Sequence, residues 1–185
     1  RGAQGGTGRY TVSLIQLPGY PLGAGDGELG ALGNGECRPG AIEPAGDLDA
    51  FTFSGQQGEV VQLRMGEIDA PVDPRIELYD PAGFFLQGAG GLNANLAEIV
   101  TALPGTGVFT VVCKGFRAGA GRYTASMLRV SAASPLHPSD PDFGRLDNGE
   151  VRLGAIGGPG DLDAAVLRAE RLDQVLLRAG EVDAA

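Results

Sequence analysis

The sequence predicts an all-β protein: an antiparallel, jelly-roll-like β-sandwich in tandem repeats of about 114 residues. Three observations support this prediction. Apolar and polar residues alternate over short stretches, turn-forming residues separate those stretches, and the sequence repeats itself. The chain has 32 Gly and 12 Pro, yet 43% of its residues are hydrophobic. Such a composition is typical of short strands joined by tight turns.

The repeat is visible in two blocks of sequence. The first block, residues 34–50, returns at residues 148–164 with an offset of 114. The second block, residues 8–13, returns at residues 121–126 with an offset of 113. The difference of one residue falls in a Pro- and Gly-rich stretch between the blocks, where an insertion costs little.

The repeat also predicts how the chain is divided. Partial repeats would leave strand edges and apolar faces without partners, so we expect either neighbouring molecules to complete them or the natural protein to be longer, and we favour the longer protein. The expected divisions are residues 1–17 for the last strand of a preceding repeat, 18–33 for a linker, 34–130 for a complete β-sandwich repeat, 131–147 for a second linker, and 148–185 for the first part of a following repeat.

Within the complete repeat, period-2 patterning predicts about eight strands, each with one buried face. Turns are expected at residues 80–83, 104–107 and 119–121, where Pro and Gly gather. In chain order, the apolar residues expected on the buried faces are Phe51 and Phe53; Val61 and Leu63; Ile76 and Leu78; Leu96, Ile99 and Leu103 in a less regular pattern; Phe109 and Val111; and Tyr123, Ala125 and Met127.

Two segments need a decision between alternatives. Residues 163–179 are rich in Ala, Leu, Arg and Glu and would favour a helix by propensity alone. Their copy, residues 49–65, has the pattern of a hairpin, and two copies of one repeat share a fold, so we predict strands. The glycine-rich stretch at residues 88–91 is predicted to be a hairpin loop.

Charge and motif content exclude several classes of protein. The net charge is −9 and Lys114 is the only lysine, which argues against a nucleic-acid partner. No apolar run has the length of a membrane span. The only histidine, His137, lies between prolines and near no nucleophile motif. We therefore predict that the chain is not an enzyme.

The order of these signals resembles the bacterial pre-peptidase C-terminal domain, a jelly-roll β-sandwich appended to secreted peptidases and found in large surface proteins. Five stretches carry the resemblance and together span nearly the whole repeat. They are residues 40–42, 46–53 (Gly-Asp-Leu-Asp-Ala-Phe-Thr-Phe), 73–83, 103–112 and 121–124 (Gly-Arg-Tyr-Thr). Two departures are Phe109, where the family usually has tyrosine, and Ala165, where the pattern expects Phe51.

The resemblance makes calcium a candidate ligand, because some members of the family bind that ion. No other cofactor is expected. The candidate ligands are acidic residues in and near the Gly-Asp-Leu-Asp motif: Asp47, Asp49, Asp26, Glu28 and Glu36. Calcium needs six to eight converging oxygens. The alternative, which we favour, is that Asp47 caps a turn and Asp49 is solvated.

The two cysteines, Cys37 and Cys113, lie near the start and the end of the complete repeat. In a β-sandwich the first and penultimate strands can be neighbours, so a disulfide is one reading. Two small buried hydrophobic residues are the other. The sequence leaves both open.

These observations favour a non-catalytic structural or adhesive repeat module of a secreted bacterial surface protein, fibre or filament. The alternative is an accessory substrate-binding module of a secreted peptidase or other hydrolase, with calcium as a stabiliser. The expected location is extracellular or at the cell surface. The expected partners are neighbouring repeats or copies of the chain, and an extracellular protein or glycan at loop aromatics such as Tyr20, Phe84, Phe85 and Phe116.

Overall fold

The computed structural model describes residues 9–17, 30–69, 71–130, 144–170, 174–177 and 179. Within these residues every regular element is a strand. The strands are β1 (Gly30–Ala31), β2 (Glu36–Ile42), β3 (Leu48–Gly55), β4 (Val60–Glu67), β5 (Pro74–Tyr79), β6 (Phe85–Gly90), β7 (Leu96–Ala102), β8 (Gly107–Gly115), β9 (Gly121–Arg129), β10 (Gly144–Arg145) and β11 (Ala165–Val166).

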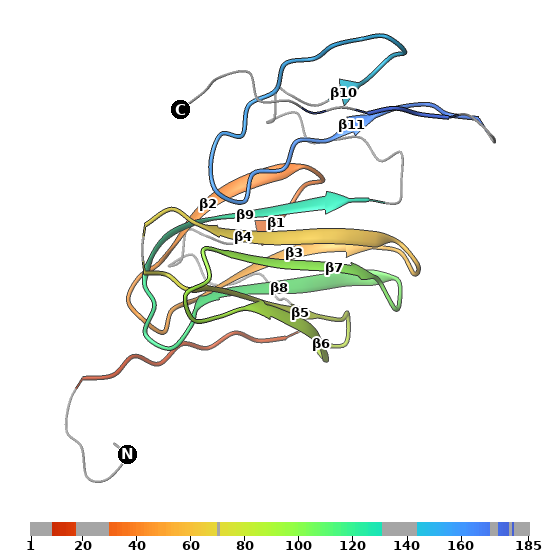
Figure 1. Cartoon of the computed structure of the whole chain (residues 1–185). Coiled ribbons are helices and arrows are strands. Elements are labelled where there is room, and N and C mark those ends of the chain that lie inside the picture. Colours follow the sequence, from red (N-terminus) through yellow and green to blue (C-terminus); the bar gives the residue numbers. More distant parts are fainter. Residues whose placement is uncertain are drawn as a thin grey trace.

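Strands β1 to β9 form two sheets packed face to face (Figure 1). One sheet has the order β1-β3-β8-β5-β6 and the other the order β2-β9-β4-β7. Apart from the parallel pair β1 and β3, neighbouring strands in both sheets are antiparallel. The alternation of strands β2 to β9 between two four-stranded layers is the jelly-roll order. The predicted all-β, jelly-roll-like sandwich is confirmed.

The core lies between the two sheets and is built from the residues that the period-2 pattern indicated. Phe53 and Phe109 stack with ring centroids 5.5 Å apart. Burial of these side chains is the main favourable term in folding such a domain. The buried residues that the pattern predicted are Phe51, Phe53, Val61, Leu63, Ile76, Leu78, Ile99, Leu103, Phe109, Val111, Tyr123, Ala125 and Met127.

The largest buried side chain, Tyr123, makes two close contacts at the hydroxyl end of its ring. Its hydroxyl donates a hydrogen bond of 2.5 Å to Oδ2 of the buried Asp49. Its ring lies against Gly40 on the neighbouring strand, where a Cβ would come within 2.4 Å of the ring. A buried phenol thus donates to one oxygen of a buried carboxylate, and glycine is required opposite the phenol.

Two turns have the chemistry that the sequence indicated. Gly46 has a φ of 90°, and the carboxylate of Asp47 accepts hydrogen bonds from the backbone amides of Glu43 and Leu48 at 3.2 and 2.9 Å. The Asp80 carboxylate accepts from the amides of Ala82 and Phe84 in the same way. In each turn an aspartate satisfies amides that the chain reversal leaves without partners.

Two local predictions within the sandwich were wrong. The glycine-rich stretch at residues 88–91 belongs to strand β6 as far as Gly90, where a Cβ would lie 2.0 Å from the carbonyl oxygen of Pro74. These glycines let neighbouring backbones pack closely at the edge of the sheet, and they do not form a loop. Leu96 is exposed, because Ala97 and Ile99 take the inward positions of β7.

The adjacent Phe84 and Phe85 are both exposed, and neither enters the core. Phe85 instead packs edge-on against Tyr79 at 5.8 Å between ring centroids, where β5 and β6 meet.

In the described part of residues 163–179, which were predicted as strands, only β11 is a strand. Residues 167–170 and 174–177 belong to no regular secondary structure. Leu172 replaces the turn residue Gly58 of the hairpin copy, but it lies outside the described residues.

We predict that Tyr123→Phe lowers the free energy of unfolding by about 1–3 kcal/mol, because it removes the donor to a buried carboxylate. Urea denaturation followed by circular dichroism measures this change. The matched control is Tyr10→Phe at the copy position, where the side chain is 87% exposed, and the expected change is within about 0.5 kcal/mol. Equal losses in both variants would contradict the account.

Candidate interaction interface

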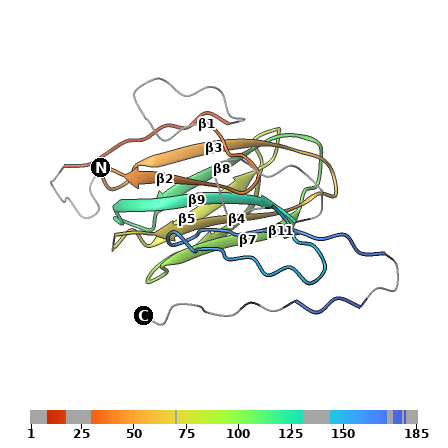
Figure 2. The same cartoon turned by 90° about the horizontal axis from the view of Figure 1, so that it is seen from above.

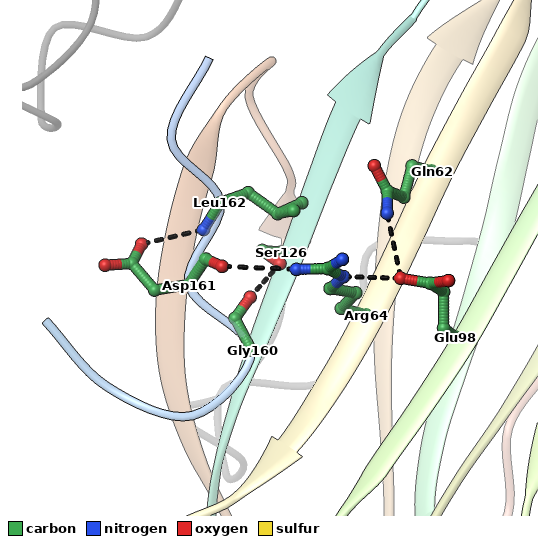
Figure 3. A network of polar contacts seen from close by, with 7 residues as sticks. All are labelled: Gln62, Arg64, Glu98, Ser126, Gly160, Asp161 and Leu162. Carbon is green, nitrogen blue, oxygen red and sulfur yellow. Dashed lines mark hydrogen bonds and ion pairs between the residues drawn. The ribbon is translucent and has the colours of Figure 1, made fainter. Parts of the chain in front are cut away.

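The outer face of strand β9 is covered, although it points away from the core. Tyr123, Ala125 and Met127 face inward, so alternation turns Thr124 and Ser126 outward. Their exposed fractions are nevertheless only 9% and 1%. The cover is a segment distant in sequence, residues 159–162, which we call the docked turn (Figures 1 and 3).

Backbone carbonyl groups of the docked turn receive the hydrogen bonds that join it to the sheet. The hydroxyl of Thr124 donates to the carbonyl oxygen of Pro159, and that of Ser126 donates to the carbonyl oxygen of Gly160 at 2.7 Å. The guanidinium of Arg64 reaches the carbonyl oxygen of Asp161 at 3.4 Å, as Figure 3 shows. The contact therefore depends on backbone carbonyl groups of the turn and not on its side chains.

A glycine on strand β4 completes the surface that receives the turn. Gly66 lies directly opposite Thr124, and Arg64 lies opposite Ser126. The backbone of the docked turn approaches Gly66 so closely that a Cβ there would lie 2.4 Å from the carbonyl of Pro159. We call Arg64, Gly66, Thr124 and Ser126 the docking patch.

Arg64 is itself held in place by its neighbours. Its Nε contacts Oε2 of Glu98 at 2.6 Å, and Gln62 donates to the same oxygen at 2.8 Å (Figure 3). The hydrogen bond from Arg64, followed by that from Gln62, lowers the pKa of the Glu98 carboxyl below its ordinary value. Glu98 remains ionised at neutral pH and orients the guanidinium toward the docked turn.

The docked turn has the same pattern of hydrogen bonds as the turn at residues 43–48. The Asp161 carboxylate accepts from the amides of Gly157 and Leu162 at 2.7 and 2.9 Å, as Asp47 does in its own turn. Gly160 has a φ of 79°, close to the 90° of Gly46. The two turns are related by the sequence offset of 114.

The same contact occurs a second time on the other side of the sandwich. The hydroxyl of Thr11 donates to the carbonyl oxygen of Ala45 at 2.7 Å, and that of Ser13 donates to the carbonyl oxygen of Gly46 at 2.8 Å. Thr11 and Ser13 are the sequence copies of Thr124 and Ser126. Two separate places in the chain thus make matching pairs of hydrogen bonds between matching residues.

Backbone pairing repeats with the same offset. In the complete unit Gly30 pairs with Phe51 in parallel strands, and further along Gly144 pairs with Ala165. The amide of Leu32 donates to the carbonyl of Thr52 at 2.8 Å, and the amide of Leu146 donates to that of Val166 at 2.9 Å. Residues 144–166 therefore begin as the complete unit begins.

Of the acidic residues proposed as calcium ligands, the three that the structure describes do not converge. Asp47 caps its turn as expected, but the expectation that Asp49 is solvated was wrong, because Asp49 is buried and points toward Tyr123. Glu36 accepts from the amide of Gly33 at 2.7 Å and pairs with Arg38 at 3.0 Å. Asp26 and Glu28 lie outside the described residues. In the part of the chain that the structure describes, no three metal-ligating side chains form a cluster.

Cys37 and Cys113 are not joined by a disulfide in this structure and belong to different sheets. Cys113 is in the core, where burial, with a smaller contribution from the Asp49 charge, raises the pKa of the thiol. Cys37 lies opposite Ser126 across the β2–β9 pair and so shares its outward face. Cys113 therefore faces the space between the sheets, whereas Cys37 faces outward from the other sheet.

Other candidate residues fall in varied positions. His137 and Tyr20 lie outside the described residues. Phe116 lies beside Arg117, whose guanidinium carbon is 5.4 Å from the ring centroid. A search of the described residues finds no helix long and apolar enough to span a membrane.

The docking patch itself was not predicted from the sequence. Period-2 patterning places Thr124 and Ser126 on the outer face of a strand, which is ordinarily solvated. The same pattern gives Gly66 no particular role. The available signal was that these residues recur in the copies together with the Gly-Asp-Leu turn. A polar face conserved between copies of one repeat indicates a contact made by each copy.

Comparison with known proteins gives limited likenesses. No protein-family model matches the sequence, and no curated protein sequence matches it. The pre-peptidase C-terminal domain of a collagenase from Bacillus anthracis is similar with a TM-score of 0.46 and 15% identity, covering 54% of this chain and 94% of that one. It belongs to the family that the sequence pattern resembles.

A second similar structure is PliG of Aeromonas hydrophila, a periplasmic inhibitor of g-type lysozyme. Its TM-score is 0.40 and its identity 11%, covering 54% of this chain and 97% of that one. The jelly-roll assignment rests on the strand order and not on these two likenesses.

We predict that Arg64→Met raises the pKa of Glu98 toward its ordinary value, because Arg64 is the largest cause of the depression. Carboxyl chemical shifts measured against pH give this pKa. A depressed folded pKa stabilises the fold above the unfolded pKa of about 4.3, and this stability is lost as pH falls through the folded pKa. Arg122→Met, which removes a pair with Asp69 instead, should leave the pKa of Glu98 unchanged. If the pKa of Glu98 in the unmodified chain has its ordinary value, the contact between Arg64 and Glu98 is refuted.

We also predict that the double variant Thr124→Val, Ser126→Ala releases the docked turn while the sandwich stays folded, because both hydroxyls lie outside the core. Nuclear Overhauser contacts between residues 124–126 and 159–160 report docking. They should disappear while the melting temperature changes little. Persistence of these contacts would show that the two hydroxyls are dispensable.

Proposed function

We propose that this chain is a non-catalytic structural module of a secreted surface protein or fibre, in which β-sandwich units follow one another through the docked contact. The observation that carries the proposal is that matching hydrogen bonds join Thr11 and Ser13 to one turn, and Thr124 and Ser126 to its copy. A contact that recurs between successive copies is the defining property of repeat proteins.

The geometry of the contact favours an extended assembly. The patch and the turn are different surfaces of the unit, so the contact is heterologous and joins units head to tail. Residues 9–17 and residues 144–170 lie on opposite sides of the sandwich in both views (Figures 1 and 2). A unit that receives its predecessor on one side and its successor on the other generates a line of units.

The strength of the contact suits orientation rather than affinity. Each hydrogen bond of this kind contributes about 0.5–1.5 kcal/mol net. Such a contact would be weak between separate molecules, but a short covalent connection supplies an effective concentration in the millimolar range. The linker holds the units together, and the contact fixes the angle between them.

The alternative role, a substrate-binding module of a secreted hydrolase, gains less support. The hollow beside the turn of Gly46 has a volume of about 340 Å³ and is lined by Arg75 and Lys114. Both cations pair with Glu77, at 3.2 and 2.8 Å. Their charges are therefore largely compensated within the domain.

The test of the proposal is the location of the protein in cells that produce it. Antibodies raised against residues 30–130 should label intact, unpermeabilised cells in extended surface structures, as seen by immunogold electron microscopy. Labelling that appears only after permeabilisation would refute the proposal. Labelling confined to a soluble secreted hydrolase fraction would favour the alternative role.

A further inference from the structure

Gly66 is a glycine that its own unit does not explain. It lies near the end of strand β4, paired with Thr124 on one side and Leu96 on the other. Gly66 lies in a regular strand, and its φ is not positive. Glycine in a strand interior costs conformational entropy and contributes no packing, so a larger residue would be expected here.

The atoms that exclude a side chain at Gly66 all belong to the docked turn. The three atoms nearest to a Cβ built there are the carbonyl carbon and oxygen of Pro159, both at 2.4 Å, and the amide nitrogen of Gly160 at 2.6 Å. These are backbone atoms, which cannot swing aside as a flexible side chain can. Glycine at this position therefore leaves room for the backbone of the following unit.

The turn carries a matching requirement. A Cβ at Gly160 would lie 3.0 Å from the amide nitrogen of Gly66 and 3.1 Å from the hydroxyl of Thr124, and the φ of 79° already disfavours other residues. At the copy of this contact, a Cβ on Gly46 would lie 2.7 Å from the hydroxyl of Thr11. The two backbones approach one another because both positions are glycine.

We propose that Gly66 is the residue that determines whether a unit can be followed by a docked neighbour, and that the neighbour must present glycine at the position of Gly160. This inference rests on the proposed function and names its specificity determinant. The sequence repeats the pair, since Gly180 is the copy of Gly66 and Gly46 the copy of Gly160. If a unit carried a side chain at this position, the following unit would not be docked against it.

The experiment uses the full chain and the substitution Gly66→Ala. The expected result is loss of the nuclear Overhauser contacts between Thr124 and Gly160, with no fall in melting temperature, because alanine suits a strand at least as well as glycine. The matched control is Gly105→Ala, where a Cβ would meet no atom within 4 Å, and the contacts should remain. Retention of the contacts in Gly66→Ala would overturn the inference.

A native thiol supplies a second readout. Cys37 shares the outer face with Ser126, while Cys113 is fully buried. Alkylation of Cys37 should be faster in Gly66→Ala than in the unmodified chain, and unchanged in Gly105→Ala. Equal rates in all three proteins would count against the inference.

The turn side provides a further matched variant. Pro159→Ala reproduces the residue found at the copy position, Ala45, and keeps the carbonyl that accepts from Thr124. The contacts should survive this change, and their loss would show that the turn is recognised by its proline. If the unmodified chain shows no contacts between residues 124 and 160, the docked contact itself fails. If they are present and survive Gly66→Ala, only the role of Gly66 fails.

Discussion

The two faces of strand β9 set the constraint on which the rest of the structure depends. Because side chains alternate along a strand, the residues that build the core also fix the position of Thr124 and Ser126 on the opposite side. The inner face carries Tyr123, buried and bonded to Asp49. The outer face carries two hydroxyls that bond to the docked turn. One strand thus joins the interior of a unit to the contact between units.

The Gly-Asp-Leu-Asp motif has a corresponding double role. Its first aspartate, Asp47, caps a turn whose carbonyl groups point outward to accept hydrogen bonds from residues 11–13. Its second aspartate, Asp49, enters the core and accepts from the Tyr123 hydroxyl. Both acidic residues of the motif therefore make contacts within the chain. The turn and the core contact it provides are both structural.

Much of the fold could be predicted from the sequence. The alternation of Phe51 with Phe53 and of Phe109 with Val111 identified core strands, because a sandwich solvates or covers one face of each sheet and buries the other. The Asp47 and Asp80 turns followed from local hydrogen-bonding chemistry. Predictions were wrong at β6 and at Leu96, since glycine at a close approach looks like a loop, and a one-residue shift reverses the face.

The interface could not be predicted in the same way. A serine or threonine on an outer strand face has the same local pattern whether it meets water or a neighbouring turn. Gly66 likewise looks like an ordinary glycine until the atoms of Pro159 are placed above it. The sequence also left a bridge between Cys37 and Cys113 open, because it does not show that Cys113 faces the core and Cys37 the outer face of the other sheet. Contacts between distant segments require coordinates, whereas periodicity reports only the immediate surroundings.

The most direct test of the account is the backbone order of residues 159–162 measured by nitrogen-15 relaxation in the full chain. The account predicts order parameters near those of strand β9, about 0.85, because the turn is fixed to the docking patch. Order parameters below about 0.6 would mean that the turn moves independently of the sheet on the nanosecond timescale. That result would contradict a contact that fixes one unit against the next.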